Sequence, residues 1–329
     1  MFYIGIDVSK AKLDCSLLMD VTNNNKRKSK VVINSKTGIS DLLVWTNKQH
    51  VTNDELHAIL EGTGVYHEQA AQALHDAGVL VSIVNPAQVR NFAFGLAIRN
   101  KTDDMDSFVL ARYGAIVQPR IWVPPSQEAR TLQALLKRRE AVAQDLLREN
   151  NRLEKADSTD TPSVCRQSII DSIKFLKAQL AKIQKEIDDH TNSHENLKED
   201  LGLLKSIPAV GPQVSNHLLA VIHNHSFDTA EKLTAYLGLV PVQRRSGSSI
   251  LGQSHISKAG PSEIRAILYM ASISAIRCNP HIKALYLRLL ERGKSKRSAL
   301  CAAMRKLVQL CFGVLKTRRA YQENYVQVS

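Results

Sequence analysis

Four carboxylates in the first third of the sequence stand where acidic residues commonly bind divalent cations. Asp7 comes at the end of a short apolar run, and Glu61 directly follows another, so both are expected at the ends of strands. Asp103 and Asp106 lie three residues apart at the start of an expected helix, a spacing that puts both on one face. Clustered carboxylates repel one another unless cations lie between them, and Mg²⁺ or Mn²⁺ prefers such oxygen ligands.

Each of these carboxylates also has a simpler structural explanation. Asp7 would cap a turn, Glu61 would face solvent, and the helical pair would favour a helix N-terminus through the helix dipole. Together, however, a strand-end aspartate, a strand-end glutamate and a helical Asp-x-x-Asp match the layout of a ribonuclease-H-like phosphoryl-transfer site, in which two metal ions clamp the attacking and leaving oxygens. The sequence therefore predicts a metal site formed by Asp7, Glu61, Asp103 and Asp106.

A second group of reactive residues lies at positions 243–249. Arg244 and Arg245 precede Ser246, and Ser248 and Ser249 follow closely. Such a loop is usually only a binding loop, yet a serine beside two arginines has the neighbours of a nucleophile, because the cations would stabilise a pentavalent phosphate. The residues alone do not choose among the three serines.

The basic charge of the chain is confined to its last third. The 329 residues contain 44 Lys and Arg against 31 Asp and Glu, a net charge of +13. Residues 1–120 carry 13 basic and 12 acidic side chains, residues 121–200 carry 13 and 14, and residues 201–329 carry 18 and 5. These last charges are interleaved with apolar helical patterns, which disfavours a generic basic tail. The distribution predicts a C-terminal region that binds the phosphates of a nucleic acid.

Several residues of this basic region are candidates for contacts with a nucleic-acid backbone. Residues 204–212, followed by 214–221, resemble a helix-hairpin-helix, whose Gly-containing turn exposes backbone N–H groups to a phosphate. A plain turn between two helices is the alternative. The expected nucleic-acid-binding residues are Gly211, Arg244, Arg245, Lys258 and Arg265.

An α/β domain is expected to position the carboxylates. Apolar and alternating patterns predict strands at 2–8, 12–19, 31–33, 57–60 and 79–84, and helices at 37–48 and 65–77. Strands followed by alternating helices and strands are typical of an α/β fold with polar residues at strand ends. Pro124 and Pro125 close this domain, which we expect to span 1–123.

The middle of the chain, 124–200, is expected to be helical. Helix formers fill 126–157 and 163–190, and a Pro-containing break separates the two segments. In the second segment an apolar stripe repeats at spacings of three and four, formed by Ile173, Leu176, Leu180, Ile183 and Ile187. An antiparallel helical hairpin, an intermolecular coiled coil and a simple buried helix would each bury this stripe. We expect residues 201–329 to form a third, mostly helical domain.

The compartment is expected to be the reducing cytoplasm. The five cysteines are widely spaced and contain no C-x-x-C pair, which disfavours a disulfide framework or a zinc site. No run of roughly 18 apolar residues suggests a membrane span.

An ordered set of short motifs spans nearly the whole chain and resembles the DEDD transposases of the family-110 insertion sequences, relatives of the Piv-type DNA invertases. The motifs are residues 3–10, 61–64, 100–103 with Asp106, 206–208, 238–241, 246–247 and 257–260. Each motif is weak alone, but their order is specific. The family pattern usually has alanine after the last aspartate, where this chain has Ser107, a change that leaves the carboxylates in place.

The resemblance implies a fold and a mechanism. It implies a RuvC-like N-terminal domain, a coiled-coil middle and a C-terminal transposase domain that together excise and insert a DNA element. It implies that the four carboxylates bind Mg²⁺ and that Ser246, rather than Ser248 or Ser249, is the nucleophile. It also implies a structured non-coding bridge RNA that pairs with donor and target DNA, and dimers that join into a tetramer.

These expectations fit together if the metal site and the serine act on one scissile phosphate. Hydrolysis by metal-bound water would not need a serine, so a RuvC-like junction-resolving nuclease is the main alternative. A non-catalytic nucleic-acid-binding protein would leave the four carboxylates unexplained.

Overall fold

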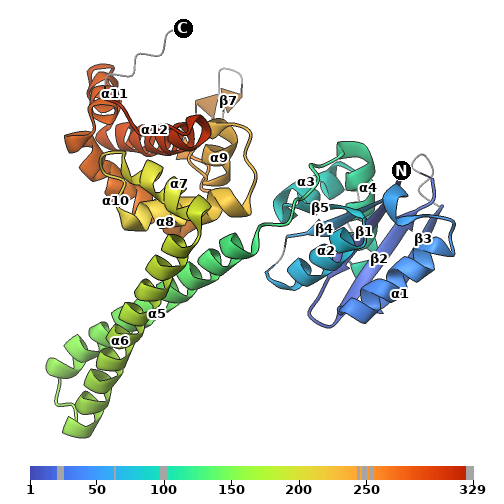
Figure 1. Ribbon diagram of the computed structural model, residues 1–329, viewed down its shortest axis with the longest axis horizontal. Helices are drawn as coiled ribbons and strands as arrows, with labels where there is room; N and C mark the ends of the chain where they lie inside the picture. Colours follow the sequence, from blue (N-terminus) through green and yellow to red (C-terminus); the bar gives the residue numbers. More distant parts are fainter. Residues whose placement is uncertain are drawn as a thin grey trace. The chain divides into compact units, whose positions relative to one another are not determined.

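The computed structural model describes residues 1–20, 26–62, 64–96, 102–242, 245–246, 250–251 and 255–323, with the backbone alone described at 245–246 and 250–251. The chain forms two compact units, Met1–Pro124 and Pro125–Ser329 (Figure 1).

The first unit is built on a mixed five-stranded sheet with strand order β3-β2-β1-β4-β5. β1, β2 and β3 pair antiparallel, whereas β4 runs parallel to β1 and β5 runs parallel to β4. The strands are β1 Phe2–Val8, β2 Lys12–Leu18, β3 Arg27–Ile33, β4 Leu56–Glu61 and β5 Leu80–Val84. The predicted α/β architecture is confirmed.

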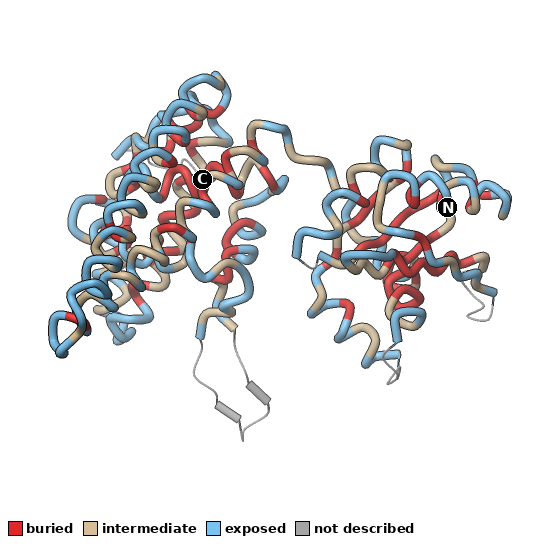
Figure 2. The backbone as a smooth tube through the Cα atoms, turned by 90° about the horizontal axis from the view of Figure 1, so that it is seen from below, coloured by how far each residue is buried: buried red, intermediate tan, exposed pale blue. Residues whose placement is uncertain are grey.

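Helices cover both faces of this sheet. α1 (Lys36–Asn47) and α2 (Tyr66–Asp76) pack on one face, and α3 (Pro86–Gly95) and α4 (Asp103–Val117) pack on the other, while the short helix η1 (Asn53–Glu55) precedes β4. Figure 2 shows a buried centre in this unit, and β1, β2, β4 and β5 are buried along most of their length, whereas the edge strand β3 is largely exposed. The apolar runs that predicted the strands therefore form the central layer of the first unit.

Two elements differ from the expectation. β3 begins at Arg27 rather than at residue 31, and Lys28 and Ser29, within its added part, are exposed. A strand at the sheet edge needs no apolar pattern, and charged residues there discourage pairing with other chains. α3 was not predicted; its signal was Pro86 at the first turn, with the Asn85 side chain accepting a hydrogen bond from the Ala87 N–H at 2.8 Å.

α4 lies unusually close to β1 because position 5 is glycine. A Cβ added at Gly5 would lie 1.9 Å from the backbone oxygen of Ser107 and 2.4 Å from the nitrogen of Ala111. Ser107 is itself buried, and its hydroxyl lies 2.9 Å from that of Ser16 on β2. The serine that stands where the family pattern has alanine thus contributes a polar contact between helix and sheet.

The second unit begins with a long helical hairpin. α5 (Gln127–Asp157) and α6 (Ser163–Ser193) pack along one another, so the predicted hairpin is confirmed (Figure 1). Ile183 and Ile187 of the apolar stripe share a core cluster with Leu132 and Leu136 of α5. The stripe is therefore buried within the chain.

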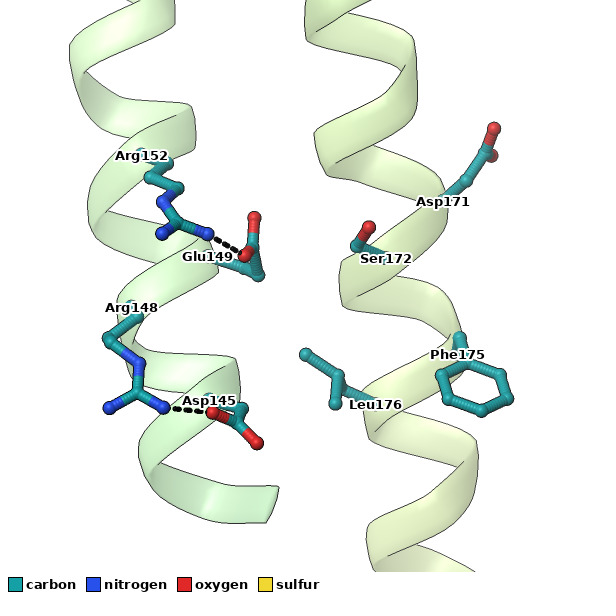
Figure 3. Close-up of a pocket in the computed structure, with 8 residues that line it drawn as sticks. All are labelled: Asp145, Arg148, Glu149, Arg152, Asp171, Ser172, Phe175 and Leu176. Carbon is teal, nitrogen blue, oxygen red and sulfur yellow. Dashed lines mark hydrogen bonds and ion pairs between the residues drawn. The ribbon is translucent and has the colours of Figure 1, made fainter. Parts of the chain in front are cut away.

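Farther along the hairpin, polar side chains cover a shallow pocket between the two helices (Figure 3). Arg148 pairs with Asp145 and Arg152 pairs with Glu149, in both cases along α5. Leu176 points from α6 toward α5, whereas Phe175 is 62% exposed.

The rest of the second unit is a bundle of helices. These are α7 Glu195–Lys205, α8 Pro212–Asn224, α9 Ala230–Tyr236, α10 Ser262–Cys278, α11 Pro280–Glu291 and α12 Lys296–Thr317. Among the described residues, α12 alone is long and apolar enough to cross a membrane. Its residues Ala303, Leu307 and Cys311 are fully buried in the core shared with α8 and α10, which is typical of a core helix in a folded domain.

Candidate active site

Asp7 and Glu61 lie at neighbouring strand ends. The parallel register pairs Ile6 of β1 with Leu60 of β4, so the following residues, Asp7 and Glu61, lie side by side along the sheet. Ile59, two residues before Glu61, packs against α4, and side chains alternate along a strand. Both carboxylates therefore belong to the sheet face that α4 covers.

The start of α4 supplies three more carboxylates. The Thr102 hydroxyl caps the helix by accepting a hydrogen bond from the Met105 N–H at 3.3 Å. Asp103, Asp104 and Asp106 then occupy the first turn, where the helix dipole favours negative charge. The cap thus fixes the residue at which the helix begins and, with it, the direction of these side chains.

The electrostatics of Asp7 show which of these groups are its neighbours. Burial raises the pKa of the Asp7 carboxyl above its usual range, and the charges of Asp106, Asp103 and Asp14 raise it further. Asp7, Asp103 and Asp106, all predicted from the sequence, are therefore brought together. Glu61 lies on the adjacent strand end.

Asp14 and Lys12 belong to this cluster and were missed by the sequence analysis. Asp14 on β2 is the direct cross-strand partner of Asp7 and is only 8% exposed. The Lys12 ammonium lies 2.7 Å from Asp103 and 3.1 Å from Asp14, and these hydrogen bonds raise the pKa of Lys12. The feature that places them is the register of the β-hairpin formed by β1 and β2. The turn that joins these strands is held by hydrogen bonds between Ser9 and Lys12, and it sets which residues of the two strands face each other.

Asp104 differs from its two helical neighbours. Its carboxylate accepts hydrogen bonds from Arg27 at 2.6 Å and from Ser29 at 2.8 Å, both on the edge strand β3. Asp104 therefore ties α4 to the sheet edge, while Asp103 and Asp106 face Asp7.

The donor set fits a hard divalent cation, since it consists of carboxylate oxygens whose mutual repulsion is only partly offset by Lys12. Among the described residues, no three His, Cys, Asp or Glu side chains are gathered closely enough to form a ready metal cage. The backbone thus brings the carboxylates into one neighbourhood without closing them around an ion.

The serine predicted as nucleophile lies in the second unit. β6 (Pro241–Val242) pairs with β9 (His255–Ile256), and β7 (Arg245–Ser246) pairs with β8 (Ile250–Leu251). Ser246 is opposite Ile250 in this second pair. Arg244, Ser248 and Ser249 lie outside the described residues, as do Thr63 and residues 100–101 of the other motifs.

Lys258 lies near the end of the connection between α9 (Ala230–Tyr236) and α10 (Ser262–Cys278) that carries Ser246, and Arg265 lies in the first turn of α10. Lys258 has a left-handed backbone conformation, with φ of 56°, and its N–H donates to the Gly238 carbonyl at 3.1 Å. Arg265 donates to the Gly260 carbonyl at 2.7 Å and so braces the segment that carries Lys258.

Gly211 is the N-cap of α8, and no side chain caps this helix. Its φ of −81° is open to any residue, and a Cβ there would meet nothing within 4 Å. The space beside Gly211 is therefore open. In the same turn the left-handed position is Ala209, with φ of 77°.

The fold and the cluster define a class. A five-stranded sheet of this mixed order, with carboxylates at two strand ends and on the covering helix, is a ribonuclease-H-like domain, and here a long helical hairpin and a helical region follow it. A transposase family profile, that of the DEDD transposases of IS110-type elements, matches residues 4–156. The transposase IS116/IS110/IS902 family matches residues 201–287.

Similar proteins cover most of the length of the chain. The pilin gene-inverting proteins of Moraxella lacunata and Moraxella bovis are each 33% identical over 324 residues, which is 98% of both chains. The transposase for insertion sequence element IS1111A of Coxiella burnetii is 24% identical over 74% of each chain. The chain belongs to the IS110-family DEDD transposases and is an enzyme of DNA cleavage and joining.

Proposed function

We propose that the chain cuts DNA with Ser246 as the nucleophile and rejoins the strand to a new partner, with Asp7, Glu61, Asp103 and Asp106 as the ligands of Mg²⁺ or Mn²⁺. The observation that carries the proposal is the clustering of Asp7, Asp103 and Asp106 on one face of the sheet of a DEDD transposase. Glu61 ends the neighbouring parallel strand, as such a site requires.

The carboxylates would hold the metal beside the scissile phosphate. Bound there, the metal would polarise the phosphate and offset the charge that develops on its oxygens. Asp7 starts from a raised pKa because it is buried among other acids, so this site favours a positive partner strongly. Lys12, already bonded to Asp103 and Asp14, supplies part of that charge from the chain itself.

The serine would conserve the energy of the broken bond. Its oxygen forms a bond to phosphorus while the bond from phosphorus to one deoxyribose oxygen breaks, and the proton of the serine hydroxyl leaves as that deoxyribose oxygen gains one. The resulting phosphoserine ester is reversed when a hydroxyl of a new strand attacks it. Arg244 and Arg245, adjacent in sequence, would stabilise the charged phosphate.

One observation favours a second function, a RuvC-like structure-specific endonuclease. The carboxylate cluster lies entirely within the first unit, and metal-dependent hydrolysis needs only such a cluster and a water molecule. The two functions differ in the fate of the cut strand, because hydrolysis leaves no protein attached.

We further propose that a bridge RNA pairs with donor and target DNA and that the protein acts in the cytoplasm. The charge of +13 within residues 201–329 supports a large nucleic-acid partner. Gly211 in front of α8, Lys258 and the two arginines 244 and 245 would contact phosphates, and Arg265 would hold their loop. RNA binding should weaken steeply with salt, and RNA transcribed from beside the gene should stimulate recombination.

The assembly is proposed to be a dimer that joins into a tetramer. The outer surface of the hairpin supports association through its exposed apolar side chains, since Leu147, Val164 and Phe175 are 62%, 78% and 62% exposed. Sedimentation of the full chain with and without RNA tests this, and Phe175→Ser should shift the distribution toward smaller species.

The test of the catalytic proposal is cleavage of a DNA substrate with and without divalent metal. The wild-type protein should cut only with Mg²⁺ or Mn²⁺, and Asp7→Asn should abolish cutting while leaving the melting temperature within a few degrees. Full cleavage in a chelator would refute the metal-dependent mechanism.

A further inference from the structure

A polar cleft of about 660 Å³ lies where the base of the helical hairpin meets α7 and α8. Its floor contains Leu136 and Leu201, which are 5% and 7% exposed. Its walls carry Arg139, Lys205, Gln213 and Asn216. The cleft lies entirely within the second unit and belongs to neither of the proposed catalytic groups.

The N-terminus of α8 opens into this cleft. An α-helix leaves its first N–H groups without partners inside the helix, and α8 has no side-chain cap to satisfy them. The end of α8 therefore carries a partial positive charge, and Lys205, also in the wall, adds a full one.

Asn216 is a second and independent sign of a ligand. Its side chain is only 5% exposed and lines the cleft, and its Oδ1 atom has no hydrogen-bond partner among the described residues. A buried amide oxygen without a partner destabilises the folded chain, so a ligand edge that pairs with this amide would supply a hydrogen bond that the described residues lack. His217 next to it is 9% exposed, and burial together with Arg139 lowers its pKa, which leaves a neutral ring in the same wall.

Hydrogen bonds hold the wall of the cleft that α5 and α6 form. The Arg139 Nε–H donates to the side-chain oxygen of Gln184 at 2.8 Å, and the amide nitrogen of Gln184 donates to Asp188 at 3.0 Å. This chain of hydrogen bonds runs from α5 along α6, so a ligand would meet oriented groups.

These features select one class of ligand. An inorganic anion would use the helix terminus and Lys205 but would leave the amide of Asn216 and the apolar floor without a role. An apolar molecule would use the floor alone. A nucleotide has a phosphate for the helix terminus and Lys205, and a flat base for the apolar floor. The edge of that base carries hydrogen-bonding groups for the Asn216 amide.

We infer that this cleft binds one unpaired nucleotide of a single-stranded nucleic acid, with the phosphate at the N-terminus of α8 beside Lys205 and the edge of the base at Asn216. The inference deepens the proposed function, because an enzyme that exchanges strands and pairs them with RNA must handle unpaired nucleotides. DNA and RNA share this chemistry, so both are tested.

The experiment measures the affinity of the full chain for labelled single-stranded DNA and RNA oligonucleotides of one length, and for the matching duplexes. Asn216→Leu removes the amide at similar size and should weaken single-strand binding about tenfold. Lys205→Gln should weaken it less and reduce the salt slope by about one. Lys198→Gln, at another exposed lysine of α7 outside the cleft, is the matched control and should bind like wild type.

Thermal melting separates binding from folding. Because Asn216→Leu replaces an unpaired buried amide, it should melt at the same or a higher temperature while it binds more weakly. Unchanged single-strand affinity in this variant would refute the inference, as would an equal loss for duplexes. Competition by inorganic phosphate as strong as that by a nucleoside monophosphate would also refute it, because the cleft would then be an anion site.

These readouts need neither metal nor cleavage, so they separate this inference from the proposed catalytic function. If wild type forms recombinants while Asn216→Leu binds normally, the inference alone fails. If no cleavage is found but the variant loses single-strand binding, the catalytic proposal alone fails.

Discussion

The two groups proposed to act in catalysis are built in different ways. The carboxylates of the first unit come from adjacent strands and from the start of α4, a helix packed within backbone contact of β1. Ser246 lies on a strand of two residues, within the connection between α9 and α10. The difference teaches that the proposed metal ligands take a fixed geometry from the core, whereas the proposed nucleophile lies in a connection between two helices.

The largest effect on DNA cleavage is expected at the carboxylate cluster of the first unit. Asp7→Asn and Asp106→Asn should each lower the rate of DNA cleavage by more than about 100-fold, because they remove proposed metal ligands. Asp104→Asn is the matched control in the same helical turn, since Asp104 bonds to Arg27 and Ser29 instead. It should keep its cleavage rate and lose less than about 1 kcal/mol of unfolding free energy. Equal loss of cleavage in all three variants would contradict the distinction.

The packing of α4 on β1 can be tested at Gly5. Gly5→Ala should lower the free energy of unfolding by about 1–3 kcal/mol or more, because the new methyl group meets backbone atoms that cannot move alone. It should also slow cleavage, since a shift of α4 moves Asp103 and Asp106 relative to Asp7. Gly95→Ala is the control, because a Cβ there meets nothing within 4 Å. Chemical denaturation and cleavage assays check both, and an unaffected Gly5→Ala protein would rule out the close packing.

The second unit is expected to lose stability in acid when Asp200 is protonated. Burial alone would raise the pKa of this carboxyl, but hydrogen bonds from His223 and Arg318 more than offset burial, so its pKa is lowered in the folded chain. The contribution to stability is therefore complete above the unfolded pKa of about 4 and is lost as the pH falls below it. Asp200→Ala should cost about 1–3 kcal/mol at neutral pH. It should also show a shallower loss of stability in acid than wild type, and parallel acid profiles would exclude this role.

The smallest effect is expected at Lys12, the counter-charge of the acidic cluster. Lys12→Met removes the ammonium that bonds Asp103 and Asp14, so the cluster should attract a cation more strongly. The Mg²⁺ concentration for half-maximal cleavage should fall roughly two- to fivefold, while Lys12→Arg stays near wild type. A higher Mg²⁺ requirement for Lys12→Met would show that the lysine helps metal binding in another way.

The sequence was most informative where a residue type and its place in an element carried the chemistry. Asp7 and Glu61 were expected at strand ends and lie there, and the Asp103 and Asp106 pair starts a helix as expected. Asp14 and Lys12 were missed because their roles depend on which residues of β1 and β2 face each other. Cross-strand register depends on turn geometry, which the types of residue do not reveal singly.

The cleft at α8 was missed for a related reason. The helix-hairpin-helix-like pattern pointed to Gly211, but the walls come from four consecutive helices, α5 to α8, whose lining residues are spread between positions 136 and 217. That Asn216 is buried without a partner depends on all of them at once. Likewise, the apolar stripe of α6 fitted several assemblies, and only the packing of α5 against it identified the hairpin within the chain.

The most direct test of the central claim is the fate of the cut DNA strand under denaturing conditions. Wild-type protein with Mg²⁺ and substrate should yield a covalent protein–DNA adduct that maps to Ser246 by mass spectrometry. Ser246→Ala should form no adduct and cut no DNA, Asp7→Asn should form none, and Ser248→Ala and Ser249→Ala should still form it. Cutting by Ser246→Ala at the wild-type rate, with no adduct from either protein, would contradict the account and identify a metal-dependent hydrolase.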